Sequence, residues 1–300
     1  MLKSFTILPV EAIEKGGVHA SLILPEALPL LIRSPPPAGR VLCLQVNLNN
    51  CVVALAIAEV YEQGRSAQLF SFVVAEAFRG RRIGTALFKE LQDILYAEGI
   101  HSLGFEYEQT SPFAPILEKI LFHHHWLQPQ LYLIRSRFKS VDFNPRWLNR
   151  SYAVPGKVTL FPWAELSSEE RQVVNWMDEQ GHFIPALSPF QQEDRIEPVN
   201  SLGLRCEGRL IGWLITHRVN PETIRYSSLF LEREFLLSGY GIFLLVQSIQ
   251  LQKQTDIPDA LFEVNLEKID PSWLRFVKRR LLPYAYSTEK MKWAFHSHPL

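Results

Sequence analysis

Residues 79–85 combine the side chains and the backbone best suited to hold a phosphate group. The run Arg79-Gly80-Arg81-Arg82-Ile83-Gly84-Thr85 contains three arginines and two glycines. An apolar run at 69–75 precedes it, and apolar residues at helical spacing follow it, so it forms the turn from a buried strand into a helix. The first N–H groups of a helix lack partners and its dipole favours an anion there. Glycines without a Cβ let the backbone approach a ligand closely.

The elements that position this turn follow from hydrophobic periodicity. The first half of the chain has five strand patterns and two helix patterns. The strands are expected at residues 41–46, 52–61, 69–75, 101–107 and 131–138, and the helices at 82–98 and 112–125. The order β-β-β-α-β-α-β indicates an α/β fold of the α+β kind, with a mixed, mainly antiparallel sheet flanked by helices.

A weak internal repeat relates the two halves of the chain. Similar residues recur at an offset of 157 positions, as in 241 − 84 = 157. The matched residues are Phe78 with Phe235, Gly84 with Gly241, Leu87 with Leu244, and Phe105-Glu106 with Phe262-Glu263. Turn, strands, glycine turn, helix and strand recur in the same order. We therefore expect a first domain at 1–140, a linker at 141–156 and a second domain at 157–300.

The turn also resembles a known family signature. Arg79-x-x-Arg82-x-Gly84 is similar to the (Gln/Arg)-x-x-Gly-x-(Gly/Ala) motif of the GNAT superfamily of acyl-CoA-dependent N-acyltransferases, with Arg82 in place of the usual first glycine. The element order is that of the GNAT core. The resemblance covers most of residues 41–138 and 201–296 and implies two tandem GNAT-like domains.

The resemblance implies a donor site in the first domain. It assigns acetyl-CoA, or another acyl-CoA, as co-substrate, bound through Arg79, Gly80, Arg81, Arg82, Ile83, Gly84 and Thr85. It also assigns the backbone N–H groups of Val73 and Val74 to the pantetheine and thioester. Ser111 occupies roughly the place of an asparagine that often follows the next strand. The acceptor would be a primary amine on a small molecule or peptide, and no metal is expected.

The acid and base of the reaction are less clear from the sequence. The family's usual tyrosine is missing, because Leu117 or Glu118 falls at its position. Tyr107 lies nearby in the sequence. The candidate bases are Glu59, which ends a strongly apolar strand, and Glu106. Glu106 recurs as Glu263, which also fits a carboxylate with a shared structural role.

The two turns differ in a way that separates the domains. In residues 236–241, Gly239 and Gly241 restore both family glycines, but Leu236 replaces Arg79 and no Lys or Arg remains. Exposed cation–phosphate contacts contribute about 1–2 kcal/mol each when charge-assisted. The first domain is therefore predicted to bind the donor, and the second is predicted to be degenerate or to bind through its backbone alone.

Composition limits the other functions. Lysine plus arginine and aspartate plus glutamate each number 31, so the formal net charge is zero and no broad nucleic-acid surface is expected. Three cysteines without metal-like spacing fit a reducing compartment. No signal-peptide pattern opens the sequence, and the apolar stretch 235–251 contains too many polar residues for a membrane span. We expect a cytoplasmic protein whose domains pair as an internal pseudo-dimer.

Two alternatives to an acyl-CoA-dependent N-acetyltransferase stay open. The missing tyrosine and the altered glycine fit a non-catalytic acyl-CoA-binding or regulatory protein. An aminoacyl-tRNA-dependent transferase also fits the tandem resemblance, although the zero net charge disfavours tRNA binding. A Rossmann-type nucleotide enzyme is weaker, since no G-x-G-x-x-G follows a first strand.

Overall fold

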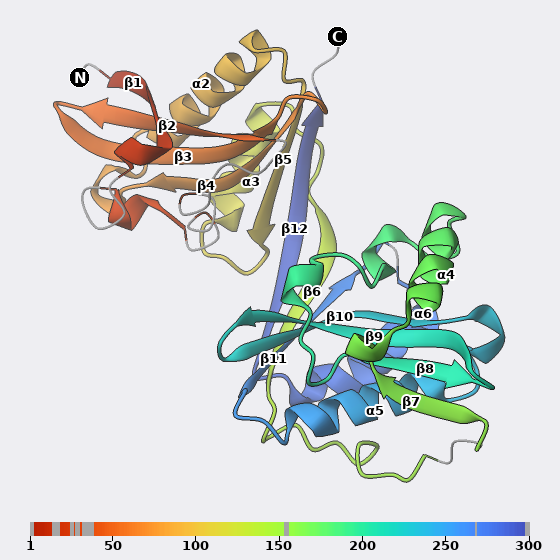
Figure 1. Ribbon diagram of the computed structural model, residues 1–300. Helices are drawn as coiled ribbons and strands as arrows, with labels where there is room; N and C mark the ends of the chain where they lie inside the picture. The colour runs from red at the N-terminus through yellow and green to blue at the C-terminus, as the bar shows by residue number, and fades with distance from the viewer. Residues whose placement is uncertain are drawn as a thin grey trace. The chain divides into compact units, whose positions relative to one another are not determined.

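The structure, a computed structural model, describes residues 3–13, 19–24, 27, 31, 39–152, 156–267 and 269–297. These residues form two compact units (Figure 1). Unit 1 contains Met1–Tyr132 together with Lys290–Leu300, and unit 2 contains Leu133–Glu289. Each unit is a mixed, mostly antiparallel sheet flanked by helices, as the sequence predicts.

Unit 1 has the strand order β1-β2-β3-β4-β5-β12, in which only β4 and β5 run parallel. The strands are β1 (Lys3–Leu8), β2 (Arg40–Leu48), β3 (Cys51–Tyr61), β4 (Ser66–Val74), β5 (Ser102–Glu108) and β12 (Ser287–Ser297). Helices α2 (Ile83–Ala97) and α3 (Ala114–His123) pack on one face of this sheet. Ile13, Leu22, Ala27 and Leu31 pack on the opposite face, against Cys43, Leu55 and Ile57.

Unit 2 has the strand order β6-β11-β10-β9-β8-β7, with β10 and β11 parallel. Its strands are β6 (Gln130–Lys139), β7 (Val158–Pro162), β8 (Leu202–Cys206), β9 (Arg209–Asn220), β10 (Thr223–Leu231) and β11 (Asp259–Asn265). Helices α5 (Tyr240–Gln252) and α6 (Pro271–Phe276) cover one face, and α4 (Ser168–Glu179) packs on the other. Ser167 and Glu170 form a capping box at the start of α4.

The repeat is visible in the elements themselves. Strands β4 and β10 differ by 157 positions at both ends, as do β5 and β11, and α2 and α5 at their first residues. The irregularities recur too. Phe70 of β4 has no partner residue in the pairing with β3, and Ser227 of β10 has none in the pairing with β9. A β-bulge at the same repeat position is a stronger sign of common architecture than the few identical residues.

The closing strands of the two repeats are exchanged. Residues 133–139 of β6, expected to close the first domain, pair antiparallel with β11 in unit 2. Residues 291–297 of β12 pair antiparallel with β5 in unit 1. The division of the chain therefore differs from the expected 1–140, 141–156 and 157–300. The expected linker belongs to unit 2, where Phe143, Trp147 and Leu148 are buried.

A glycine makes room for the exchanged strand in unit 1. A Cβ on Gly104 would lie 2.3 Å from the ring of Trp293, which belongs to β12. Such a separation is far below any van der Waals contact, so any larger residue at position 104 would displace the tryptophan. The sequence of β5 is thus fitted to a strand that lies almost two hundred positions later in the chain.

Candidate functional site

The turn between β4 and α2 has the backbone shape of an anion-binding loop. After β4 the chain makes a short 3-10 turn, Glu76–Phe78, and α2 begins at Ile83. Gly80 has φ 76° and Arg82, the N-cap residue of α2, has φ 58°. Arg82 thus adopts the left-handed conformation that glycine takes without strain, and Gly239 of unit 2 has φ 84° at the equivalent position.

The first turn of α2 is open to a ligand. No side chain caps it, and no hydrogen bond of the described residues engages an N–H group of residues 80–85 outside the helix. Within the described chain, no carboxylate forms an ion pair with Arg79, Arg81 or Arg82. Partnerless N–H groups, a helix dipole and unpaired guanidinium groups together favour a multiply charged anion at this turn.

Arg79 also stabilises the protein around the turn. Its Nε donates a hydrogen bond of 3.0 Å to the carbonyl oxygen of Val74 at the end of β4. Its guanidinium lies 4.6 Å from the ring centroid of Phe113, the residue before α3. Arg79 therefore joins β4, the turn and α3. All three arginines are exposed, and Arg81 lies 5.5 Å from the ring centroid of Phe78 within the turn itself.

Strands β4 and β5 separate beside this turn. They pair only from Ser66 with Ser102 to Leu69 with Phe105, after which β4 stays with β3 and β5 with β12. Ala75 N–H bonds to the Val53 carbonyl of β3 at 2.9 Å. Backbone N–H and C=O groups of successive residues in a strand point to opposite sides. Those of Val73 therefore point to β3, while those of Phe72 and Val74 point to the gap between β4 and β5. Of the two expected residues, Val74 faces the gap.

Glu59 lies on the face of β3 opposite α2. It pairs in register with Gln68, one residue before the last β4–β5 pair, and its exposed fraction is 6%. The Tyr61 hydroxyl donates to its Oε2 at 2.5 Å, and burial raises the pKa of Tyr61. A Cβ on Gly39 would lie 3.3 Å from the carboxylate. Glu59 is therefore a buried carboxylate at the level where the strands part.

On the helix side of the gap, three side chains share a hydrogen-bond cluster. The Tyr107 hydroxyl and the Lys292 ammonium each donate to Glu118 Oε1 at 2.8 Å. The hydrogen bond from Lys292 lowers the pKa of Glu118, and burial raises the pKa of Tyr107. Tyr107 follows the last paired residue of β5, Phe105, by two positions and lies on the same face.

The other two expected residues are placed less centrally. Glu106 accepts a hydrogen bond from the Tyr132 hydroxyl and, by alternation, points to the face opposite Tyr107. Ser111 lies in the turn before α3, where its Oγ accepts a 3.4 Å hydrogen bond from the N–H of Phe113. Lys292 could not be foreseen, because it is 174 residues from Glu118 and reaches it only through the exchanged strand.

The equivalent turn of unit 2 is closed. The Ser238 hydroxyl accepts from the Tyr240 N–H at 3.1 Å and so engages one N–H of the α5 start. Leu236 and Leu237, which replace Arg79 and Gly80, are 60% and 100% exposed. Arg209 nearby is paired with Glu232 and Glu234. This turn offers an anion fewer N–H groups than the first and no unpaired guanidinium in the turn itself.

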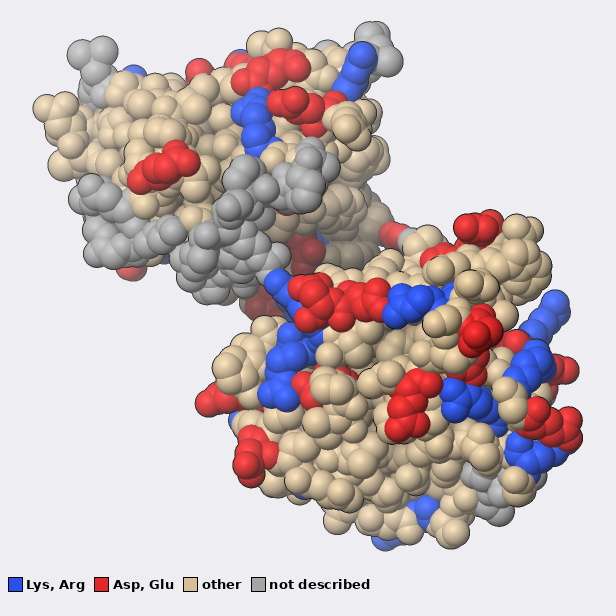
Figure 2. All heavy atoms as spheres, in the orientation of Figure 1, with Lys and Arg blue, Asp and Glu red and all other residues tan. Residues whose placement is uncertain are grey.

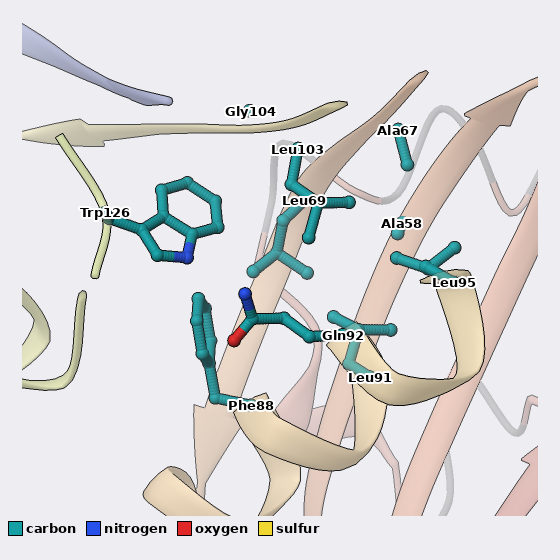
Figure 3. A pocket seen from close by; sticks show the side chains of 10 residues that line it. All are labelled: Ala58, Ala67, Leu69, Phe88, Leu91, Gln92, Leu95, Leu103, Gly104 and Trp126. Atoms are coloured by element: carbon teal, nitrogen blue, oxygen red, sulfur yellow. The ribbon is translucent and has the colours of Figure 1, made fainter. Parts of the chain in front are cut away.

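The void beneath α2 is a separate feature of the core. Apolar side chains from α2, β4 and β5 line it, together with Gln92 and Trp126 (Figure 3). It lies between the helix and the paired part of the sheet, so it belongs to the packing of unit 1 rather than to the gap. Unit 1 also contains a buried thiol, that of Cys43. Burial raises the pKa of this thiol to about 12, so it stays protonated and is a poor nucleophile.

No arrangement of three His, Cys, Asp or Glu side chains among the described residues fits a metal ion. The consecutive histidines at 123–125 lie at the end of α3, whose last residue is His123. His124 packs against Phe88 with 5.3 Å between ring centroids, and burial lowers its pKa. No helix in the described parts of the chain is long and apolar enough to cross a membrane.

Comparison with known families agrees with this geometry. Residues 20–111, which contain β4, the arginine turn and α2, match the model of the Acetyltransferase (GNAT) family. This part of unit 1 is therefore similar in sequence to the GNAT family of acetyltransferases. No curated protein matches the sequence.

Solved structures show the same tandem fold. A tandem GNAT protein from the clavulanic acid biosynthesis pathway is similar over 100% of both chains, at 14% identity and a TM-score of 0.62. A GCN5-related N-acetyltransferase from Sphaerobacter thermophilus is similar over 99% of this chain and 97% of its own, at 13% identity and a TM-score of 0.65. At these identities the likeness concerns the fold, and the acceptor must be approached from the site.

The unusual residue Arg82 in this turn gives a stability prediction. Arg82→Gly should raise the free energy of unfolding by roughly 0.5–1 kcal/mol, because a left-handed conformation costs a residue with a Cβ about 1–2 kcal/mol and glycine's added chain entropy offsets part of that gain. Chemical denaturation measures the change. Arg82→Ala is the matched control, since it removes the same charge but keeps the Cβ. An equal gain in both variants would contradict backbone strain at position 82.

Proposed function

We propose that unit 1 binds acetyl-CoA at residues 79–85 and transfers its acetyl group to a primary amine. The observation that carries the proposal is the uncapped start of α2 beside the gap between β4 and β5, where three arginines form no ion pair with any described carboxylate. The pyrophosphate would accept from the N–H groups of this turn and pair with Arg81 and Arg82. The family match supports the donor class, and acetyl as the acyl group is our proposal.

The pantetheine arm would follow the edge of β4 into the gap. The outward polar groups of Val74 and Phe72 are backbone partners for its amides, in the manner of an added strand. The four residue-to-residue steps of β4 from Val74 to Phe70 span about 13 Å. The thioester would then lie near the point where β4 and β5 part, with Glu59 on one face of the sheet and Tyr107 on the other.

Glu59 would act as general base. A primary amine at physiological pH is protonated and must lose a proton before it attacks the thioester carbonyl carbon. The nearly buried Glu59 carboxylate lies on the face opposite the CoA-binding helix, where an acceptor can approach the thioester. The proton passes from the amine to Glu59, directly or through one water.

Tyr107 would act as proton donor in place of the missing tyrosine of α3. When the tetrahedral intermediate collapses, the carbon–sulfur bond breaks and its electron pair moves to sulfur, which takes the phenolic proton. Burial raises the pKa of Tyr107, so the phenol carries this proton throughout the physiological range. Lys292 balances the negative charge of Glu118 beside the phenolate until solvent returns a proton.

This assignment gives a second prediction. Tyr107→Phe should lower kcat about tenfold or more without changing KM for acetyl-CoA, because proton donation contributes about 10²–10⁴ in general acid catalysis and water replaces part of it. Lys292→Gln should lower kcat in the same direction, and Lys290→Gln, an exposed site on the same strand, is its control. Steady-state release of free CoA thiol measures both. A Tyr107→Phe variant with wild-type kcat would exclude the role.

The experiment that tests the function combines binding and turnover. Calorimetric titration of acetyl-CoA into the whole protein should show one site, and acetyl-CoA with a panel of primary amines should give acetylated product. Binding without turnover on the whole panel would favour a non-catalytic acyl-CoA-binding protein. On the face drawn in Figure 2, basic and acidic side chains are interspersed, which agrees with the zero net charge and disfavours a tRNA-dependent reaction.

We also propose a cytoplasmic location, for which the three unpaired cysteines, Cys43, Cys51 and Cys206, are the support. That the two domains pair as an internal pseudo-dimer stays a prediction.

A further inference from the structure

Unit 2 has a histidine at the position that Glu59 occupies in unit 1. His217 of β9 pairs in register with Arg225, and Glu59 of β3 pairs with Gln68, which lies 157 positions before Arg225. The exposed fraction of His217 is 3%. Unit 2 thus places a titratable ring where unit 1 places its buried carboxylate.

The partners of His217 fix which nitrogen carries the proton. Nε2 lies 2.8 Å from the carbonyl oxygen of Gln191, which can only accept, so Nε2 is the donor. In the neutral ring Nδ1 is then an acceptor, and the Ser227 hydroxyl lies 2.7 Å from it. Burial lowers the pKa of His217 and keeps the ring neutral. The arrangement carbonyl, histidine, serine is that of an activated nucleophile.

A cation completes this cluster. Arg225 Nε donates to Ser227 Oγ at 3.0 Å, and its Nη2 donates to Gln192 Oε1 at 2.8 Å. A guanidinium beside the serine stabilises negative charge on its oxygen and on a neighbouring oxyanion. Ser227 itself is only half-buried. Ser227 is thus partly open to solvent, and its Oγ also lies 3.3 Å from the Arg225 carbonyl oxygen, a weaker alternative acceptor for its proton.

The loop that supplies the Gln191 carbonyl is held on β9 by several contacts. Ile196 forms a β-bridge with His217, and the N–H of Glu197 bonds to the Thr216 carbonyl at 2.9 Å. The nearly buried Glu197 carboxylate also pairs with Arg218 at 2.6 Å. These contacts hold the carbonyl, the imidazole and the hydroxyl in register, as a preorganised site requires.

Ser227 lies at a distinctive point of the fold. It is the bulge residue that β10 leaves unpaired, and it directly follows Tyr226, whose pair with Phe262 is the last between β10 and β11. The equivalent point of unit 1 is where the proposed function places the thioester, and this one comparison rests on that proposal. The serine–histidine geometry stands independently of it.

We propose that Ser227 is a nucleophile that accepts an acyl group from an activated ester or thioester, with His217 as its general base. Ser227 Oγ attacks the acyl carbon while its proton passes to His217 Nδ1. The carbon–oxygen or carbon–sulfur bond to the leaving group then breaks, its electron pair goes to the leaving atom, and His217 returns the proton to that atom. The product is an O-acyl serine and a free alcohol or thiol.

Diisopropyl fluorophosphate is the probe that tests this site, because it reacts with activated serines and needs no CoA. Full-length protein treated with it should carry one adduct, mapped to Ser227 by peptide mass spectrometry. Ser227→Ala should lose the adduct, and His217→Asn should form it at least tenfold more slowly. Ser168→Ala, at an exposed serine of α4, should be labelled like the wild type.

If His217→Asn fails to fold, the relative labelling rates of the serines in the wild type are sufficient to test the proposal. Labelling of Ser227 at least tenfold faster than of any other serine supports the site, and labelling spread over serines or absent from Ser227 overturns it. An unchanged rate in a folded His217→Asn variant also overturns it. The Arg79→Ala/Arg82→Ala variant should keep the adduct on Ser227 even where acetyl-CoA no longer binds, which separates this proposal from the one for unit 1.

Discussion

Replacing Arg81 and Arg82 together by glutamate should lower the affinity for acetyl-CoA by roughly a hundredfold or more. Each removed cation–phosphate contact contributes about 1–2 kcal/mol at an exposed site, and each introduced carboxylate adds repulsion. These two arginines are chosen because neither supports the fold in the way that Arg79 does through Val74 and Phe113. Isothermal calorimetry at two salt concentrations measures the loss, and the wild type should show the steeper salt dependence.

The control for this double variant lies in the other repeat. Arg233→Glu reverses an exposed charge just before the turn of unit 2. It should leave the affinity for acetyl-CoA within about twofold of wild type if unit 1 holds the donor. A large loss in Arg233→Glu, with none in the Arg81 and Arg82 variant, would move the donor to unit 2 and contradict the proposed function.

Glu59→Gln should lower kcat by about a hundredfold or more. The amide keeps the size and a hydrogen-bonding oxygen but cannot take a proton, and general base catalysis contributes about 10²–10⁴. Affinity for acetyl-CoA should not change, because Glu59 lies on the face of the sheet opposite the arginine turn. Rates are measured with the best amine of the panel at saturating acetyl-CoA.

Glu62→Gln is the matched control for this variant. Glu62 lies three positions later, is exposed and pairs only loosely with Arg40, at 3.3 Å. Its replacement should leave kcat unchanged. If Glu59→Gln retains wild-type kcat while binding acetyl-CoA normally, the base is elsewhere and the buried carboxylate only supports the strand.

Much of the fold could be predicted because its signals are local. The strand-to-helix turn and the 157-residue offset each depend on a few neighbouring residues or on the order of short patterns. Helix α2 was expected at 82–98 and spans Ile83–Ala97. The arginine turn was equally local, since all its groups lie within seven consecutive residues.

The exchange of β6 and β12 could not be predicted for a physical reason. The two strands occupy the same place in their repeats and differ by 157 positions at their first residues. Each has the alternation needed to pair with either β5 or β11, and the side-chain pattern of a strand specifies a face and a register rather than a partner sheet. Only contacts such as Gly104 with Trp293 distinguish the two pairings.

The functional contacts outside the turn could not be predicted because they join residues that are far apart in the sequence. Lys292 meets Glu118 across 174 residues, and Gln191 meets His217 across 26. The carbonyl that orients His217 is a backbone atom, which no sequence motif marks. Val73 and Val74 were indistinguishable by type, and only the Ala75 hydrogen bond to Val53 shows which one faces the gap.

The exchanged strands also dictate an order of folding during synthesis. Unit 2 is one continuous segment, so all of its strands are available once residue 289 has left the ribosome. Unit 1 must wait for residues 290–297, and until then β5 is an unpaired edge that invites aggregation. The half of the protein that is made first is therefore the half that finishes folding last.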